Sequence, residues 1–209
     1  MLEPFLNKFI LLFVVIDPIG LVPIFAALTL GGADAYRRRM AIQGTALAGV
    51  ILVLFALGGN RLLSYLGVGV PAFGIAGGAL LFLLAIDMVL ARRTGLRSTT
   101  PAEQAEAEHR TDISVFPLAV PLIAGPGAFT TLLLLLAEPG DALLDILGVL
   151  VTLLAVLLVT LLMLLATPHV MKLLGETGAN VIGRVLGIVL AALAMQYILD
   201  GIRAAFAAA

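Results

Sequence analysis

The sequence predicts an all-α, polytopic membrane protein with six transmembrane helices, arranged as two inverted three-helix repeats in which helices one and four are broken. The composition, the spacing of the apolar runs and a pattern that recurs in both halves predict this fold. Of the 209 residues, 62% are hydrophobic and only 12% are charged, and the mean hydropathy is +1.18. Soluble domains are about 45–50% apolar, so this composition indicates an integral membrane protein.

Six apolar runs are long enough to cross a bilayer, which takes ~20 residues of helix. They cover residues 5–29, 40–58, 71–91, 115–136, 142–166 and 181–204. Gly59-Asn60-Arg61 reads as a turn after the second run, and residues 62–70 are expected to lie along the interface. The chain then divides into a first three-helix repeat (1–91), a cytoplasmic connector (92–114) and a second three-helix repeat (115–209).

Lys and Arg are spread unevenly over the expected loops. With the amino terminus outside, nine of the 12 lie on the cytoplasmic side, and only Lys8, Arg61 and Arg203 lie outside. Because basic residues favour the cytoplasmic side, both termini are expected on the outer side. The acidic start Met1-Leu2-Glu3-Pro4 lacks the basic region of a removable signal peptide, so we expect the first helix to be retained.

Several classes of site are excluded by composition. The chain has no cysteine, which removes disulfides, thiol catalysis and Cys-type metal sites. Its net charge is −1 and it has no basic tract suited to nucleic acid. His109 and His169 are far apart in the expected topology, so we predict no metal site and no cofactor.

One ionisable residue interrupts the first apolar run. Asp17 is followed by Pro18 and Gly20, and Asp then Pro is a common N-cap and first residue of a new helix. The run therefore reads as two half-helices. Irregular backbone at this depth has to be buried in protein or line a wet cavity, and an ionisable residue there is a functional-site candidate.

A second interruption lies at the matching place in the other half, at Gly125, Pro126 and Gly127. Because each half has an odd number of crossings, the second half is inverted relative to the first, as in secondary transporters with a midplane site at broken helices. When the two halves are aligned, further residues match, and we expect most of them to pack helices together. The matches are Leu66-Gly67 with Leu174-Gly175, then Gly69, Gly74 and Gly78 with Gly178, Gly183 and Gly187, and finally the polar pair Asp87 and Gln196.

Two segments around the breaks carry a family resemblance. They are IDPIGLVPIF at 16–25 and PLAVPLIAGPGAFTT at 117–131. With these motifs the chain resembles the MarC family of bacterial and archaeal inner-membrane proteins, also called the UPF0056 or neutral amino acid transporter (NAAT) family. The resemblance implies a six-helix inner-membrane protein of the LysE-like exporter superfamily. Transport of glycine, alanine and similar amino acids is attributed to some members, and many have no assigned substrate.

The two breaks suit a zwitterionic solute. Half-helix starts at Pro18 and Pro126 would direct N–H groups and a positive dipole end toward the membrane centre. The uncharged second start suits a carboxylate, whereas Asp17 suits an ammonium group, a coupling proton or sodium. Alternatively, Asp17 only caps its half-helix and the second break is only a packing kink. The predicted substrate-binding residues are Asp17, Pro18, Gly20, Gly125, Pro126, Gly127, Thr130 and Thr131.

Two further polar residues are candidates for a gate or a coupling path. Asp87 could act there or pair with Arg92 and Arg93 at the cytoplasmic edge. Its counterpart Gln196 could act there or form a hydrogen bond between helices.

We therefore predict an inner-membrane secondary transporter of small neutral amino acids or related metabolites, working by alternating access, and not an enzyme. A channel or an exporter of another solute is the main alternative, because the same breaks could line a pore. An intramembrane aspartyl protease would need two aspartates in one site, and neither Asp17 nor Asp87 follows Gly-x-Gly. The expected partners are the solute, a proton or sodium ion and the lipid bilayer. The sequence decides neither the direction of transport nor whether the chain forms a homo-oligomer.

Overall fold

The computed structural model describes residues 2–90, 112–137 and 142–207, and every element in these ranges is a helix. Most of the predicted connector, residues 92–114, lies outside the described residues. In chain order the elements are α1 (Leu2–Ile16), α2 (Pro18–Leu28), α3 (Asp34–Tyr65), α4 (Val70–Val89), the irregular helix η1 (Ser114–Ile123), α6 (Pro126–Ala137), α7 (Ala142–Leu165) and α8 (Thr167–Ala207).

The described helices include five that are long and apolar enough to cross a membrane, or six if the bent pair η1 and α6 is counted as one span. α1 and α2 together form one of the five, Phe5–Leu28. The predicted all-α, polytopic fold is thereby confirmed, and so are interruptions in the first and fourth spans. The inverted repeat stays a prediction.

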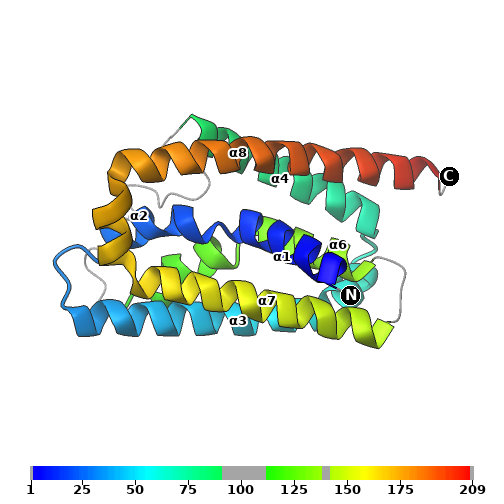
Figure 1. The fold of residues 1–209 in the computed structure, drawn as a ribbon. Coiled ribbons are helices and arrows are strands. Elements are labelled where there is room, and N and C mark those ends of the chain that lie inside the picture. The colour runs from blue at the N-terminus through cyan, green and yellow to red at the C-terminus, as the bar shows by residue number, and fades with distance from the viewer. Residues whose placement is uncertain (1, 91–111, 138–141, 208–209) are drawn as a thin grey trace.

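The broken spans lie in the middle of the molecule (Figure 1). α3 and α7 pack together on one side of them, and α4 and α8 pack together on the other. Both termini lie at the same end of this array (Figure 1). The broken spans are therefore supported from two sides by the other helices.

The predicted turn at Gly59-Asn60-Arg61 is wrong, because α3 continues without interruption from Asp34 to Tyr65. Gly59 is buried in α3, and a Cβ atom there would come 3.0 Å from the Leu133 side chain. A helical glycine costs about 1 kcal/mol relative to alanine, and packing against α6 offsets this cost. The last span is also longer than predicted, since α8 runs to Ala207 after a break at Gly175 (φ 63°, ψ 179°).

η1 departs from a regular helix. Phe116 and Val120 have extended backbone angles inside it, and each precedes a proline in a cis peptide bond, Pro117 and Pro121. At its start, the Ser114 hydroxyl and backbone N–H donate to Asp112, at 2.6 and 2.9 Å. These two hydrogen bonds, with Arg39 nearby, hold the pKa of the Asp112 carboxyl below its usual value.

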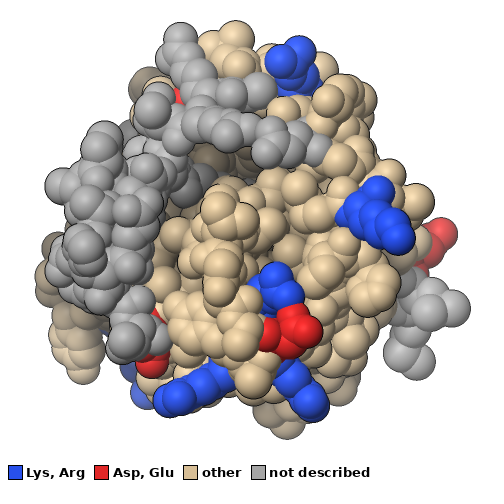
Figure 2. Space-filling view, turned by 90° about the vertical axis from the view of Figure 1, so that its left-hand side faces the viewer, with Lys and Arg blue, Asp and Glu red and all other residues tan. Residues whose placement is uncertain are grey.

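Basic side chains lie on the end of the molecule opposite the termini (Figure 2). Arg37, Arg38 and Arg39 lie in the first two turns of α3, where Arg37 pairs with Asp34. Lys172 lies in α8 before the break at Gly175. Arg92, Arg93, Arg97 and Arg110 lie outside the described residues.

The contact between α4 and α8 depends on glycine. A Cβ atom on Gly78 would lie 2.8 Å from the Ala194 carbonyl oxygen, and one on Gly187 would lie 3.1 Å from the Ala85 carbonyl oxygen. Each glycine thus lets the backbone of the facing helix approach closely. Gly183, also expected to pack, has nothing within 4 Å of its Cβ position.

Gly78→Ala should therefore destabilise the protein, because the Ala194 carbonyl belongs to helix backbone and cannot turn away. We expect the free energy of unfolding to fall by about 1–3 kcal/mol, the usual cost of overpacking. Gly183→Ala is the matched control and should leave stability unchanged or higher. Thermal unfolding of both variants in detergent checks this, and equal melting temperatures would contradict it.

Candidate functional site

The first break is a capped helix start built on Asp17. This residue has left-handed backbone angles (φ 52°, ψ 65°), and its Oδ1 accepts a hydrogen bond from the Gly20 N–H at 3.0 Å. Its backbone N–H donates to the Phe13 carbonyl at 2.8 Å, and its own carbonyl accepts from the Leu21 N–H at 3.1 Å. The chain thus stays hydrogen-bonded on both sides of the break.

Gly20 makes room for this cap. A Cβ atom at Gly20 would overlap the Asp17 carboxylate, with its carbon only 2.8 Å away. Pro18 is the first residue of α2. A backbone N–H at this position has no acceptor within the helix, so the N–H that proline lacks costs no hydrogen bond. The spacing of Asp17, Pro18 and Gly20 therefore follows from the geometry of the cap, and Asp17 is only 1% exposed.

The second break has no carboxylate. η1 ends at Ile123, α6 begins at Pro126, and the two meet at a bend of 52°. The Gly125 carbonyl accepts the first helical bond, from the Phe129 N–H at 3.2 Å. A Cβ atom at Gly125 would lie 2.6 Å from the Pro121 carbonyl oxygen, so the bend requires glycine.

The two breaks lie beside one another. A Cβ atom on Gly127 would lie 3.1 Å from Val15 Cγ1 and would overlap Leu81 of α4. Val15 comes two residues before Asp17, so the end of α1 packs on the start of α6. The structure thus brings the predicted residues of both halves into one region.

A cavity of about 100 Å³ opens at the second break. Its walls come from α1, α4, η1 and α6, and are formed by Val15, Leu80, Leu81, Leu84, Pro121, Ile123, Gly125, Pro126, Gly127 and Ala128. The three predicted residues of the second break all line it. Asp17, Pro18 and Gly20 do not.

A second cavity of about 280 Å³ lies on the other side of Pro126. It is lined by Phe55, Phe73, Ala76, Gly77, Leu80, Pro126, Phe129 and Thr130. Pro126 and Leu80 are common to both cavities. Both sets of walls are mainly apolar, since carbon-rich side chains form most of each.

The two predicted threonines already have hydrogen-bond partners. The Thr130 hydroxyl donates to the Pro126 carbonyl at 2.9 Å, and its side chain fills the space that Gly77 leaves open. Thr131 is fully buried, and its hydroxyl accepts a hydrogen bond from the Tyr197 hydroxyl at 3.3 Å. A ligand at Thr130 would have to share or replace the bond to Pro126.

Asp87 and Gln196 lie apart from the breaks. Asp87 is half-buried near the end of α4, and neither residue lines a cavity at the second break. Gln196 is exposed on α8, where its Nε2 donates to both carboxylate oxygens of Asp200, at 2.8 and 2.9 Å. Their assignment to a gate or a coupling path stays a prediction.

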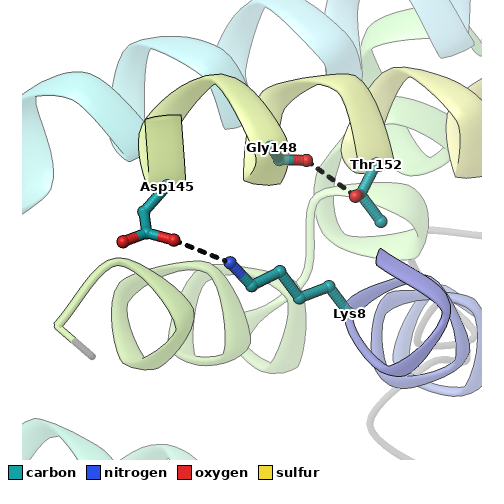
Figure 3. Close-up of polar contacts among 4 residues, drawn as sticks. All are labelled: Lys8, Asp145, Gly148 and Thr152. Carbon is teal, nitrogen blue, oxygen red and sulfur yellow. Dashed lines mark hydrogen bonds and ion pairs between the residues drawn. The ribbon is translucent and has the colours of Figure 1, made fainter. Parts of the chain in front are cut away.

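Sequence reasoning missed an ion pair between the two halves of the chain. Lys8 of α1 reaches Asp145 of α7 at 3.4 Å, with side chains 13% and 38% exposed. Figure 3 shows this contact beside the hydrogen bond from the Thr152 hydroxyl to the Gly148 carbonyl, at 2.7 Å within α7. The sequence signal for this ion pair was Lys8 itself, because a charged residue inside an apolar run needs a partner.

The fold and these interruptions define the class of the protein. A chain whose described elements are all helices, with five or six candidate spans and broken helices at its centre, is an integral, multi-pass membrane protein. Residues 2–206 match the family model described as "MarC family integral membrane protein". The chain therefore belongs to the MarC family.

Relatives agree with this assignment. A UPF0056 membrane protein of Archaeoglobus fulgidus is 39% identical over 95% of this chain and 92% of its own length. The UPF0056 membrane protein YvbG of Bacillus subtilis is 33% identical over 96% and 94%. The UPF0056 inner membrane protein YhgN of Escherichia coli is 31% identical over 93% of each chain. No solved structure matches the chain.

The cap at Asp17 gives a test of stability. Asp17→Ala removes the acceptor for the Gly20 N–H and places alanine in left-handed backbone, so we expect a loss of about 1–2 kcal/mol, as for other N-caps. Asp17→Asn keeps a side-chain acceptor and a residue type that tolerates these angles, so its melting temperature should stay close to that of the wild type. Thermal unfolding in detergent measures both. Equal losses would contradict the assignment of the cap.

Proposed function

We propose that this chain is an inner-membrane secondary transporter of small neutral amino acids or related metabolites, with its solute site at the second break. One observation carries the proposal: the start of α6 lines a cavity where it meets the first broken span. The first N–H groups of a helix have no acceptor within the helix. Those of Gly127 and Ala128 therefore suit a carboxylate, and a cavity of about 100 Å³ admits only a small solute.

Asp17 is the acidic group of the proposed site. It lies two residues from Val15, which lines the cavity, and its carboxylate caps α2. The site can use this charge to bind a substrate ammonium group, a proton or sodium. Because Oδ1 of the same carboxylate accepts the Gly20 N–H, ligand binding at Asp17 would be linked to the start of α2.

The packing of the two halves supports alternating access. The second segment of each broken span packs on the last helix of the other half of the chain, α2 on α8 and α6 on α4. The first segment packs on the middle helix of the other half, α1 on α7 and η1 on α3. Gly67 and Gly175, aligned by sequence, both have left-handed backbone, with φ 69° and 63°. Such exchange of partners is the arrangement expected of inverted repeats that rock around a central site.

The charge distribution supports an orientation with both termini on the outer side. Arg37, Arg38, Arg39 and Lys172 lie at the end opposite the termini, and basic residues favour the cytoplasmic side. The inner-membrane location is inferred from the name of the relative YhgN, a UPF0056 inner membrane protein.

Transport by Asp17→Asn tests the proposed role of the carboxylate. This variant keeps a cap but has no charge, so we expect it to fold normally and to lose uptake in proteoliposomes. The assay is exchange of a panel of radiolabelled neutral amino acids, with and without a pH gradient. Normal exchange by Asp17→Asn would remove the carboxylate from the mechanism, and saturable counterflow separates a carrier from a channel.

The pair of Lys8 and Asp145 is proposed to hold the end with the termini closed in this conformation. Lys8 precedes Asp17 by nine residues, about 14 Å of helix, close to half of the ~30 Å hydrocarbon core. It therefore lies near the membrane boundary when Asp17 lies at the midplane. Breaking the pair removes an ionic contact between α1 and α7, which belongs to the other half.

Charge exchange tests this closure. Lys8→Asp and Asp145→Lys each place like charges together, so we expect each to lower exchange and the melting temperature. The double variant Lys8→Asp with Asp145→Lys restores opposite charges and should recover both quantities. Proteoliposome exchange and thermal unfolding measure the effect. A double variant no better than either single variant would show that the pair has no role.

A further inference from the structure

The cavity of about 280 Å³ is a groove between two membrane spans. Phe55 of α3 forms one wall, Phe73 and Ala76 of α4 form the other, and Pro126 and Phe129 of α6 form the floor. Phe55 packs edge-on against Phe129, with ring centroids 4.5 Å apart. The one hydroxyl in the lining, that of Thr130, already donates to the Pro126 carbonyl.

The groove is open on the side away from α6. α3 and α4 both pack on α6, and the described residues of the two helices meet through the rings of Phe55 and Phe73, whose centroids are 6.3 Å apart, which leaves the opening beside Ala76 and Leu80. Ala76 is exposed, and Leu80 is 39% exposed. On the flanking helices Leu54 and Leu83 point outward, 65% and 50% exposed. An opening bordered by such residues, between two membrane spans, faces the hydrocarbon core.

The chemistry of the groove selects its occupant. A buried water needs two to four polar partners, and this lining offers none that is not already bonded. An empty groove forfeits the dispersion contacts of its walls. A flexible methylene chain needs no hydrogen bonds and restores those contacts. It is also the material that the surrounding bilayer supplies.

The dimensions of the groove agree with one leaflet. Phe73 and Leu80 are seven residues apart on α4, about 10 Å of helix. Half of the hydrocarbon core is ~15 Å thick. Phe73 lies in the first turns of α4, at the same end as the termini, because the Pro71 carbonyl oxygen lies 2.8 Å from the Cβ position of Gly201 near the carboxyl end of α8.

We propose that this groove binds one acyl chain of a membrane phospholipid, from the leaflet at the end with the termini. The chain lies along α4 over Ala76 and Leu80, beside the Phe55 and Phe73 rings, whose centroids are 6.3 Å apart, and ends against Pro126. Because Pro126 and Leu80 also line the cavity at the second break, the bound chain completes the outer wall of that cavity. This site does not depend on the proposed transport function.

The absence of tryptophan from the sequence allows a direct test. Phe129→Trp places a single indole on the floor of the groove, and bromine on an acyl chain quenches indole emission on contact. The variant is reconstituted in phosphatidylcholine vesicles with plain or brominated acyl chains. We expect emission to fall in the brominated vesicles. Phe73→Trp provides the same readout from the opposite wall if Phe129→Trp does not fold.

Two controls separate binding in the groove from general exposure to lipid. Phe25→Trp lies in the protein core, where Phe25 is 1% exposed, and its emission should not change. Leu154→Trp lies on the outer face of α7, where Leu154 is 57% exposed, and should be quenched. Adding Ala76→Leu fills the groove, so it should weaken quenching of Phe129→Trp and leave that of Leu154→Trp unchanged.

The outcomes decide the proposal. Equal emission of Phe129→Trp and Phe73→Trp in plain and brominated vesicles would overturn it, and so would quenching that Ala76→Leu does not reduce. If chemical cross-linking of the unquenched variants showed dimers joined through α4, a second copy of the chain would be the occupant instead of lipid. Loss of amino acid exchange in Asp17→Asn has no bearing on this result.

Discussion

The structure depends on one constraint: backbone polar groups exposed by a helix break within a bilayer have to be satisfied by the protein, because the hydrocarbon offers no partner. The two breaks meet this constraint differently. At the first, Asp17 binds the Gly20 N–H and keeps both half-helices hydrogen-bonded to its own backbone. At the second, a cavity lies beside the new helix start instead of a carboxylate. The first break is capped by its own side chain, and the second adjoins a cavity.

The remaining helices hold these breaks in place. Gly78 and Gly187 let α4 and α8 approach at backbone distance, while α3 and α7 cover the opposite side. The buried threonines of α7 do not reach toward the breaks. Thr152 and Thr160 donate to carbonyls of their own helix, at 2.7 and 2.8 Å. The surrounding walls thus contribute packing, and the polar chemistry is concentrated at the interruptions.

Features encoded in short local patterns could be predicted from the sequence. Asp17 before Pro18, and Gly125 before Pro126, marked the breaks because N-capping and proline geometry act within one turn. The turn predicted at Gly59 failed for the opposite reason, since contact with Leu133, 74 residues away in the sequence, decides that this glycine stays helical. The partner of Lys8 could not be predicted either, because it lies on a distant helix.

Only part of the candidate site could be predicted, because local patterns are visible in the sequence and contacts between distant residues are not. The glycines and proline of the second break line a cavity, yet the walls that limit its size are Val15, Leu80 and Leu81, which look in sequence like any other apolar residues of a span. Periodicity identifies a membrane helix but cannot tell a side chain that faces lipid from one that faces a cavity.

The position of Pro126 connects the two cavities physically. It is the first residue of α6 and part of both linings, together with Leu80. A movement of α6 about Gly125 that enlarges the cavity beside α1 therefore moves the same proline toward the groove beside α3 and α4. Packed interiors change between discrete arrangements and do not deform continuously. An acyl chain in that groove would consequently bias which arrangement of the second break is populated, and the lipid composition would act on the site without touching the solute.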